Sequence, residues 1–146
     1  MSESKQLHLD SLCRRVMSVI TYYNKTYINA VNQFLENFEL NNAPPIVETY
    51  VAHMNEIISE LKTVEEEISD ISNIDHLNKC RRIRYMIDIH YAHMQLVVTN
   101  HAKILSGVDD NTPIHGKRIL IPLMTELLKY DDIFTEFSIK QLKSLL

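Results

Sequence analysis

The scarcity of glycine and proline constrains this chain more than any other feature of its sequence. The 146 residues include two glycines and four prolines, and all six lie between positions 44 and 122. These two residue types interrupt helices more strongly than any others, so long stretches of the chain contain nothing that would end a helix. The sequence therefore predicts long helices separated by few loops.

Apolar residues recur every three or four positions between residues 7 and 40, which is typical of an amphipathic helix and not of a strand. The residues of this stripe are Leu9, Leu12, Val16, Val19, Tyr23, Tyr27, Val31, Phe34 and Phe38. The segment is either one helix or two helices with a kink near "YYNKT". Its β-branched and aromatic residues have modest helix propensity, so packing against neighbours must stabilise it.

Loop signals divide the rest of the chain. The segment "NNAPP" ends the first element, and Pro45 suits the first turn of the next helix. Candidate caps for the third helix are Ser72, Asn73 or Asp75 at its start and Gly107 at its end. We expect helices over about 7–40, 45–70, 76–105 and 119–145, with a loop at 106–118. The predicted fold is all-α: one domain over residues 1–146, an up-and-down bundle of four to five long amphipathic helices, with no C-terminal β domain.

Each later helix also has an apolar stripe. In the second helix it comprises Val47, Tyr50, Met54, Ile57 or Ile58, Leu61, Val64 and Ile68. In the third it comprises Cys80, Ile83, Ile87, His90 or Tyr91, Met94, Val97 or Val98, His101 and Ile104. In the last it comprises Leu123, Leu127, Tyr130, Phe134, Phe137, Leu142 and Leu145 or Leu146.

Composition excludes several classes of function. The net charge of −4 provides no excess of positive charge to bind a nucleic-acid backbone, so direct nucleic-acid binding is not expected. Cys13 and Cys80 are 67 residues apart without CxxC spacing, which argues against a zinc cluster and against a disulfide-stapled secreted fold. No segment approaches the roughly 20 apolar residues that span a bilayer. We therefore expect a soluble, intracellular protein with no membrane association.

The sequence also lacks the motifs of common active sites. It has no HExxH, no GxSxG and no glycine-rich phosphate loop, and its acidic runs are typical of solvated helix faces. His90 and His93 are three residues apart and, with His101, could be read as metal ligands. A metal site also needs a third close ligand of suitable type and a second shell that fixes the ligands. We predict that the protein is not an enzyme and binds no metal or cofactor.

The stretch "CRRIRYMIDIHYAHM" at 80–94 combines the core seam of the third helix with a basic cluster. Three interpretations of Lys79, Arg81, Arg82 and Arg84 remain open. They form salt bridges with the acidic end of the second helix at 65–70, they face a partner protein, or they bind phosphate. The nearby carboxylates favour salt bridges first and phosphate last.

Two segments suggest a family. "PPIVETYVAHMNEIISELKTVEEEI" and "HLNKCRRIRYMIDIHYAHMQLVVTNHAKIL" resemble the helical A domain of the GINS replication complex, in particular its Sld-type fourth subunit. The matching residues are Pro45, Val47 and Glu48 in the first segment and Arg82, Ile83, Arg84 and Tyr85 in the second. The resemblance covers about 45–145. Arg81 departs from the family's glutamate, the chain has no tryptophan, and the β-rich B domain is missing.

This resemblance implies a non-catalytic scaffold subunit that supports the replicative helicase in the nucleus. Its implied partners are the other GINS subunits, the MCM helicase and the helicase's cell-division-cycle cofactor. We place the partner interface on the third helix, at Arg81, Arg82, Arg84, Tyr85, Ile89 and His93. The alternative is a helical adaptor or peptide-binding bundle in another nuclear or host-interaction assembly.

Overall fold

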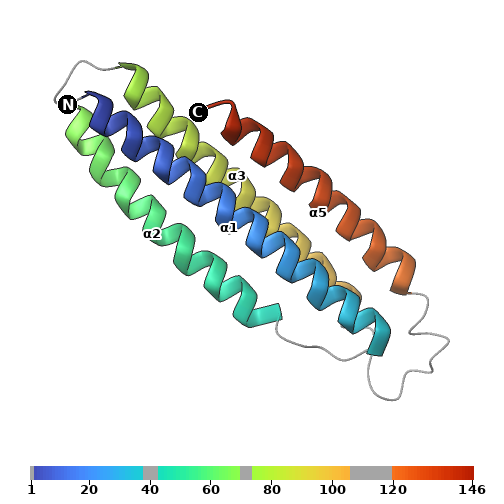
Figure 1. The fold of residues 1–146 in the computed structure, drawn as a ribbon. Helices are drawn as coiled ribbons and strands as arrows, with labels where there is room; N and C mark the ends of the chain where they lie inside the picture. Colours follow the sequence, from blue (N-terminus) through green and yellow to red (C-terminus); the bar gives the residue numbers. More distant parts are fainter. Residues whose placement is uncertain (1, 38–42, 70–73, 106–119) are drawn as a thin grey trace.

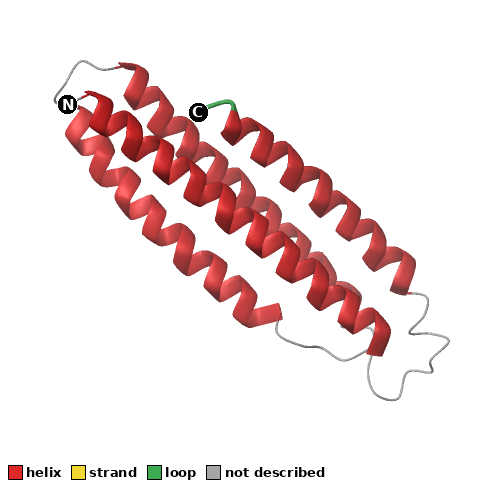
Figure 2. Cartoon of the chain, in the orientation of Figure 1, coloured by secondary structure: helices red, strands yellow, loops and turns green. Residues whose placement is uncertain are grey.

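The protein is described here by a computed structural model, which defines residues 2–37, 43–69, 74–105 and 120–146. These residues form four α-helices and no strand (Figures 1 and 2). The helices are α1 (Ser2–Asn37), α2 (Ala43–Ser69), α3 (Ile74–Leu105) and α5 (Leu120–Lys143). The prediction of an all-α fold is confirmed. None of the helices in these ranges combines the length and the apolarity that crossing a bilayer requires.

The first helix is longer than predicted and continuous. It begins at Ser2 and passes through "YYNKT" without a break. Within that segment the Thr26 hydroxyl donates to the Tyr22 carbonyl oxygen at 2.7 Å, a bond along the helix itself. Tyr23 and Tyr27 are buried, so packing against neighbouring helices supports this weak helix former.

The starts of the other helices follow from local chemistry. Helix α2 begins at Ala43, so Pro44 and Pro45 occupy its first turn, where a missing backbone N–H costs little. Helix α3 has Asp75 in its first turn, where a negative charge suits the helix dipole. The candidate caps Ser72, Asn73 and Gly107 lie outside the described residues.

Contacts between side chains fix how the helices lie. Cys13 contacts Leu142, and Asn24 contacts Asp131, so α1 and α5 run in opposite directions along each other. The colour sequence in Figure 1 gives the same picture, with the N- and C-termini at one end of the molecule. A side chain near the end of α5 therefore lies beside the beginning of α1.

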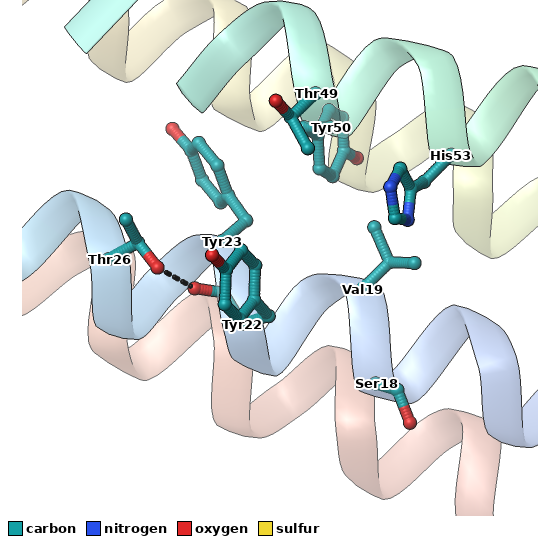
Figure 3. Close-up of a pocket in the computed structure, with 8 residues that line it drawn as sticks. All are labelled: Ser18, Val19, Tyr22, Tyr23, Thr26, Thr49, Tyr50 and His53. Atoms are coloured by element: carbon teal, nitrogen blue, oxygen red, sulfur yellow. Dashed lines mark hydrogen bonds between the residues drawn. The ribbon is translucent and has the colours of Figure 1, made fainter. Parts of the chain in front are cut away.

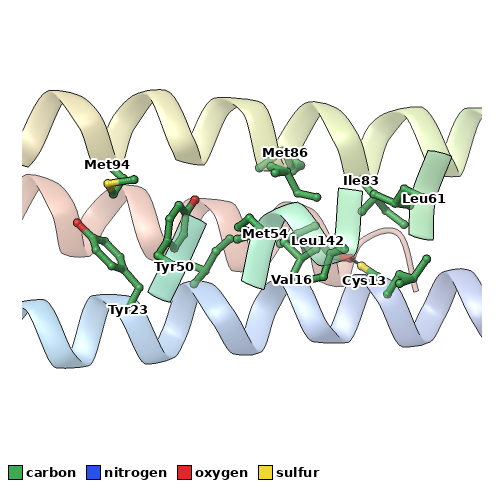
Figure 4. Packing of buried hydrophobic residues seen from close by; sticks show 14 of the residues in the cluster. Cys13, Val16, Tyr23, Tyr50, Met54, Leu61, Ile83, Met86, Met94 and Leu142 are labelled. Atoms are coloured by element: carbon green, nitrogen blue, oxygen red, sulfur yellow. Dashed lines mark hydrogen bonds between the residues drawn. The ribbon is translucent and has the colours of Figure 1, made fainter. Parts of the chain in front are cut away.

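One continuous apolar core runs between the four helices (Figure 4). The described side chains of the stripes predicted for α1, α2 and α3 face it, and His90 rather than Tyr91 takes the fully buried position in α3. The side chains of the predicted stripe residues Phe34, Phe38, Ile68, His101 and Ile104 lie outside the described part of the chain. The buried apolar residues are Leu9, Leu12, Cys13, Val16, Ile20, Tyr23, Tyr27, Val31, Tyr50, Met54, Ile57, Leu61, Val64, Cys80, Ile83, Met86, Ile87, Met94, Val97, Met124 and Leu142. Helix α5 contributes only the last two.

Candidate functional site

Two of the predicted interface arginines are engaged in salt bridges of the chain itself. Arg81 Nε lies 3.6 Å from Oε1 of Glu65 on α2, and Arg84 Nε lies 3.2 Å from Oδ1 of Asp88 on the next turn of α3. Both pairs are exposed, and such pairs contribute about 0–1 kcal/mol. The contact between Arg81 and Glu65 agrees with the salt-bridge interpretation of the basic cluster.

The remaining predicted residues lie apart from those two arginines. Arg82 is exposed and makes no ion pair with the described part of the chain. Tyr85, Ile89 and His93 follow one another at steps of four, so they form one row along α3. Tyr85 is 64% exposed, Ile89 is half-buried, and His93 contacts α5. Of the six predicted residues, the structure thus places His93 against α5.

Helix α5 divides its apolar residues between the core and the outer surface. Of the apolar residues predicted there, only Leu142 is fully buried. The residues that α5 buries are Met124, Asp131, Thr135, Ser138 and Leu142, and three of these five are polar. The large apolar side chains left exposed are Leu123, Tyr130, Ile133 and Phe137. Met124 and Leu142 are buried, and Leu128, Ile139 and Leu145 pack against the core. Helix α5 therefore has a core face that polar residues interrupt in its second half, and a separate apolar stripe that is exposed.

The exposed apolar residues of α5 continue into a hollow of about 630 Å³ beside α3. Helix α3 contributes His93, Leu96, Val97 and Asn100, and Leu96 is itself 60% exposed. Helix α5 contributes Leu127, Tyr130, Ile133, Phe134 and Phe137. We call this surface, together with Leu123, the α3–α5 face. Its composition suits the burial of apolar groups of another molecule, since contiguous exposed apolar patches mark interaction sites.

A buried hydrogen-bonded network lies directly beneath this face. The Asp131 side chain is fully buried, and its Oδ2 accepts a hydrogen bond of 2.8 Å from Nδ2 of Asn24 on α1. Its Oδ1 lies 2.9 Å from Nε2 of His93 on α3. The His93 ring stacks on Phe134, with ring centroids 4.1 Å apart. One carboxylate therefore ties α5 to both α1 and α3.

A second buried pair lies next to this network. The Tyr50 hydroxyl and Nδ1 of His90 are 2.7 Å apart, and the other ring nitrogen of His90 has no hydrogen-bond partner among the described residues. Burial lowers the pKa of His90 to about 4; nearby His93 adds to the shift and Asp131 opposes it. Burial also raises the pKa of the Tyr50 and Tyr23 phenols well above their usual range. At neutral pH His90 is therefore an uncharged ring.

The polar residues around Asp131 and His90 have a geometry that suits a role in helix packing. His90 and His93 have ring centroids 6.2 Å apart, and no group of three or more His, Cys, Asp or Glu residues suited to a metal occurs in the described ranges. The hydroxyls of Tyr23, Thr135 and Ser138 are buried without hydrogen-bond partners there. Unpaired buried hydroxyls cost free energy, whereas the hydrogen-bonded network of Asp131, Asn24 and His93 favours one arrangement of the helices over slipped alternatives.

A smaller hollow of about 330 Å³ lies between α1 and α2. Figure 3 shows its lining, which includes Val19, Tyr22 and His53 from the two helices. Its polar groups are hydroxyls and one imidazole, without a carboxylate or an ammonium group. This hollow has no arrangement of nucleophile, base or paired carboxylates.

The thiols of the two cysteines are buried and free. Cys13 donates to the carbonyl oxygen of Leu142 at 3.2 Å, and Cys80 donates to that of Leu61 at 3.4 Å. Burial raises the pKa of each thiol to about 11, so neither is a reactive thiolate at neutral pH.

No family model, no curated protein and no solved structure matches this chain. The resemblance to the GINS A domain therefore rests on the quoted sequence segments alone. The geometry adds the α3–α5 face as a candidate site, in which His93 is the one predicted interface residue that lines the hollow.

Proposed function

We propose that this protein is a non-catalytic scaffold subunit that binds another protein chain through the α3–α5 face. The exposed apolar stripe of α5 is the observation that carries the proposal. A helix that buries Asp131, Thr135 and Ser138 while exposing Tyr130 and Ile133 loses the usual benefit of apolar burial, at roughly 25 cal/mol for each Å² left in water. A partner that covers this face recovers that free energy.

The chemistry of the face favours an amphipathic helix as the bound segment. The exposed apolar residues of α5 recur at steps of three, four and seven, from Leu123 to Tyr130, Ile133 and Phe137, which is the spacing of one helical stripe. A second helix laid along this stripe places its own apolar stripe over the hollow, as in helix-in-groove recognition.

The resemblance to GINS gives this proposal a specific form. In that form the chain is an up-and-down bundle of four to five helices within a GINS-like nuclear complex that supports the replicative helicase. Arg82 and Tyr85, which are exposed on α3 of this chain, then contact a neighbouring subunit. The opposite directions of α1 and α5 support the up-and-down arrangement. The second candidate, a peptide-binding adaptor, uses the same hollow for a single helical peptide.

The test is co-expression with the three other GINS subunits, followed by size-exclusion chromatography with light scattering. The GINS form predicts one peak at equal stoichiometry, and a chain that elutes apart from all three subunits contradicts it. Ile133→Lys tests the face because Ile133 is 64% exposed and its replacement leaves the core intact. We expect Ile133→Lys to remove the chain from the complex.

Ile74→Lys is the matched control. Ile74 is 68% exposed at the start of α3, so the same substitution adds the same charge at equal exposure but away from the face. Equal retention of both variants in the complex would overturn the assignment of this face as the interface. The circular dichroism at 222 nm should be unchanged in both.

A further inference from the structure

The charges beside the apolar stripe of α5 are arranged symmetrically. Glu126 lies seven residues before Ile133, and Lys140 lies seven residues after it. Lys129 lies four residues before Ile133, and Glu136 lies three residues after it. At about 100° per residue, Lys129, Glu136 and Lys140 lie along one edge of the stripe. Glu126 lies just inside that edge, between Ile133 and Phe137. All four are exposed.

This pattern is complementary to itself when two copies of α5 run antiparallel. A two-fold axis at Ile133 places each residue opposite the residue equally far from 133 in the second copy. Glu126 of one copy then lies opposite Lys140 of the other, and Lys129 lies near Glu136. Each charge on this edge meets its opposite in both symmetry-related halves of the contact.

We propose that the chain that covers the α3–α5 face is a second copy of this protein, paired antiparallel along α5 about a two-fold axis at Ile133. This inference rests on the proposed function in that it uses the same face, and it names the partner. At the centre of the contact the exposed side chain of Ile133 meets its equivalent, and Tyr130 of one copy lies near Phe137 of the other. Arg82 and Tyr85 remain available to other subunits.

The present pairing of the edge charges is weak enough to rearrange. Lys129 Nζ lies 3.9 Å from Oε2 of Glu126 within the same helix, and both side chains are about two-thirds exposed. Such a pair contributes little and is easily exchanged for contacts across the two-fold axis. The apolar stripe supplies the affinity, while the charges select the antiparallel orientation.

Sedimentation equilibrium of the full chain, with charge swaps, tests the pairing. We expect the wild-type protein to be a dimer. Glu126→Lys and Lys140→Glu should each weaken the dimer roughly 5- to 30-fold, since each places like charges opposite at two symmetric positions. The double variant Glu126→Lys/Lys140→Glu should regain dimerisation near the wild-type level. An equimolar mixture of the two single variants should do the same.

Recovery in the double variant and in the mixture is specific to a self-complementary antiparallel contact. A wild-type chain that remains monomeric at high concentration would overturn the inference, as would a double variant no better than the singles. Ile133→Lys should abolish the dimer, whereas Ile74→Lys should leave it intact.

A second measurement uses the residue on the axis. Because Cys13 and Cys80 are buried, an introduced cysteine is the main accessible thiol. Ile133→Cys should form an intermolecular disulfide on mild oxidation, and Ile74→Cys should not. Equal cross-linking of the two variants would count against the axis.

The two proposals fail in different ways. A monomeric wild-type chain that enters a complex with the GINS subunits, and leaves it on Ile133→Lys, overturns only the self-pairing. A dimer with the full swap pattern that ignores those subunits overturns only the GINS form of the proposed function.

Discussion

The two ends of this bundle are built differently. At the end that contains both termini, the core is aliphatic, with Leu12, Val16 and Ile83 fully buried and Leu142 closing it from α5. At the other end, the core contains stacked aromatic rings and the network around Asp131. Figure 4 shows this change along the core, from Cys13 and Leu61 to Tyr23 and Tyr50.

The comparison shows that two kinds of interaction hold α5 in place: apolar burial and buried hydrogen bonds. Near its end, α5 is fixed by apolar burial, which is strong but insensitive to direction. In its middle, α5 is fixed by a carboxylate with partners on two helices, which requires one rotation and one register. The polar end therefore determines which face of α5 looks outward.

The largest expected effect comes from removing the carboxylate that connects three helices. Asp131→Ala leaves the Asn24 amide and the His93 ring buried without their partner, and we expect a loss of about 3–5 kcal/mol in the free energy of unfolding. Urea unfolding followed by circular dichroism measures it. The exposed neighbour Asp132 is the control, since Asp132→Ala should change stability by less than about 0.5 kcal/mol.

If Asp131→Ala does not fold, Asp131→Asn keeps the volume and part of the hydrogen bonding, so its smaller loss remains measurable. A loss below about 1 kcal/mol for Asp131→Ala would contradict the role of the network, because leaving buried polar groups unpaired costs more than that.

The aliphatic end should respond to a cavity instead. Leu12→Ala removes buried methyl groups from a fully buried side chain, and we expect a loss of about 2–5 kcal/mol. Leu7→Ala is the control, because Leu7 is largely exposed on the same helix. The free-energy cost of Leu12→Ala should be the same at pH 5 and pH 8. The aliphatic end should thus differ from the polar end, whose stability depends on pH. A cost that changes with pH would show that the two ends are coupled.

The polar end should make the whole fold acid-sensitive through His90. The folded-state pKa of His90 is lowered to about 4, from an ordinary 6.5, so the unfolded chain binds the proton more readily. The stability from neutral His90 is present above pH 6.5 and is lost as pH falls from 6.5 towards 4. The loss is on the order of 3 kcal/mol.

Urea midpoints between pH 4 and pH 8 measure this dependence, and His90→Phe supplies the control because it removes the titrating group but keeps a ring. The variant should show a flatter profile than the wild type over the same window. An equally steep profile in His90→Phe would assign the acid sensitivity to other groups.

Sequence periodicity predicted the fold where burial follows apolarity. The described stripe residues of α1, α2 and α3 are buried or pack against the core as expected, because in those helices apolar residues also make the best core contacts. The same rule fails for α5, where Asp131 points inward and Ile133 outward. A carboxylate inside a core is stable only beside specific partners, and Asn24 and His93 lie 107 and 38 residues away in sequence. Periodicity carries no information on such distant pairs.

Periodicity likewise predicted only the α3 part of the candidate interface. His93 and Ile89 belong to the side of α3 that helical spacing places beside a neighbour, whereas the residues of α5 that complete the face were expected to give an ordinary apolar stripe. One available signal was the run "YDDIF", where two carboxylates interrupt the stripe. Asp131 lies four residues after Leu127 and three before Phe134, so its carboxylate falls on the face of the predicted apolar stripe.

The smallest expected effect belongs to an exposed ion pair at the aliphatic end. Arg15 on α1 pairs with Glu60 on α2, and both side chains are 42% exposed. Arg15→Ala should therefore cost only about 0.2–1 kcal/mol, and the cost should shrink in 0.5 M salt because solvent ions screen exposed pairs. The effect of Asp131→Ala should persist in the same salt, because that carboxylate is fully buried. Unfolding measured at low and high salt for both variants thus distinguishes Arg15, an exposed surface charge, from Asp131, the buried charge that fixes the rotation of α5.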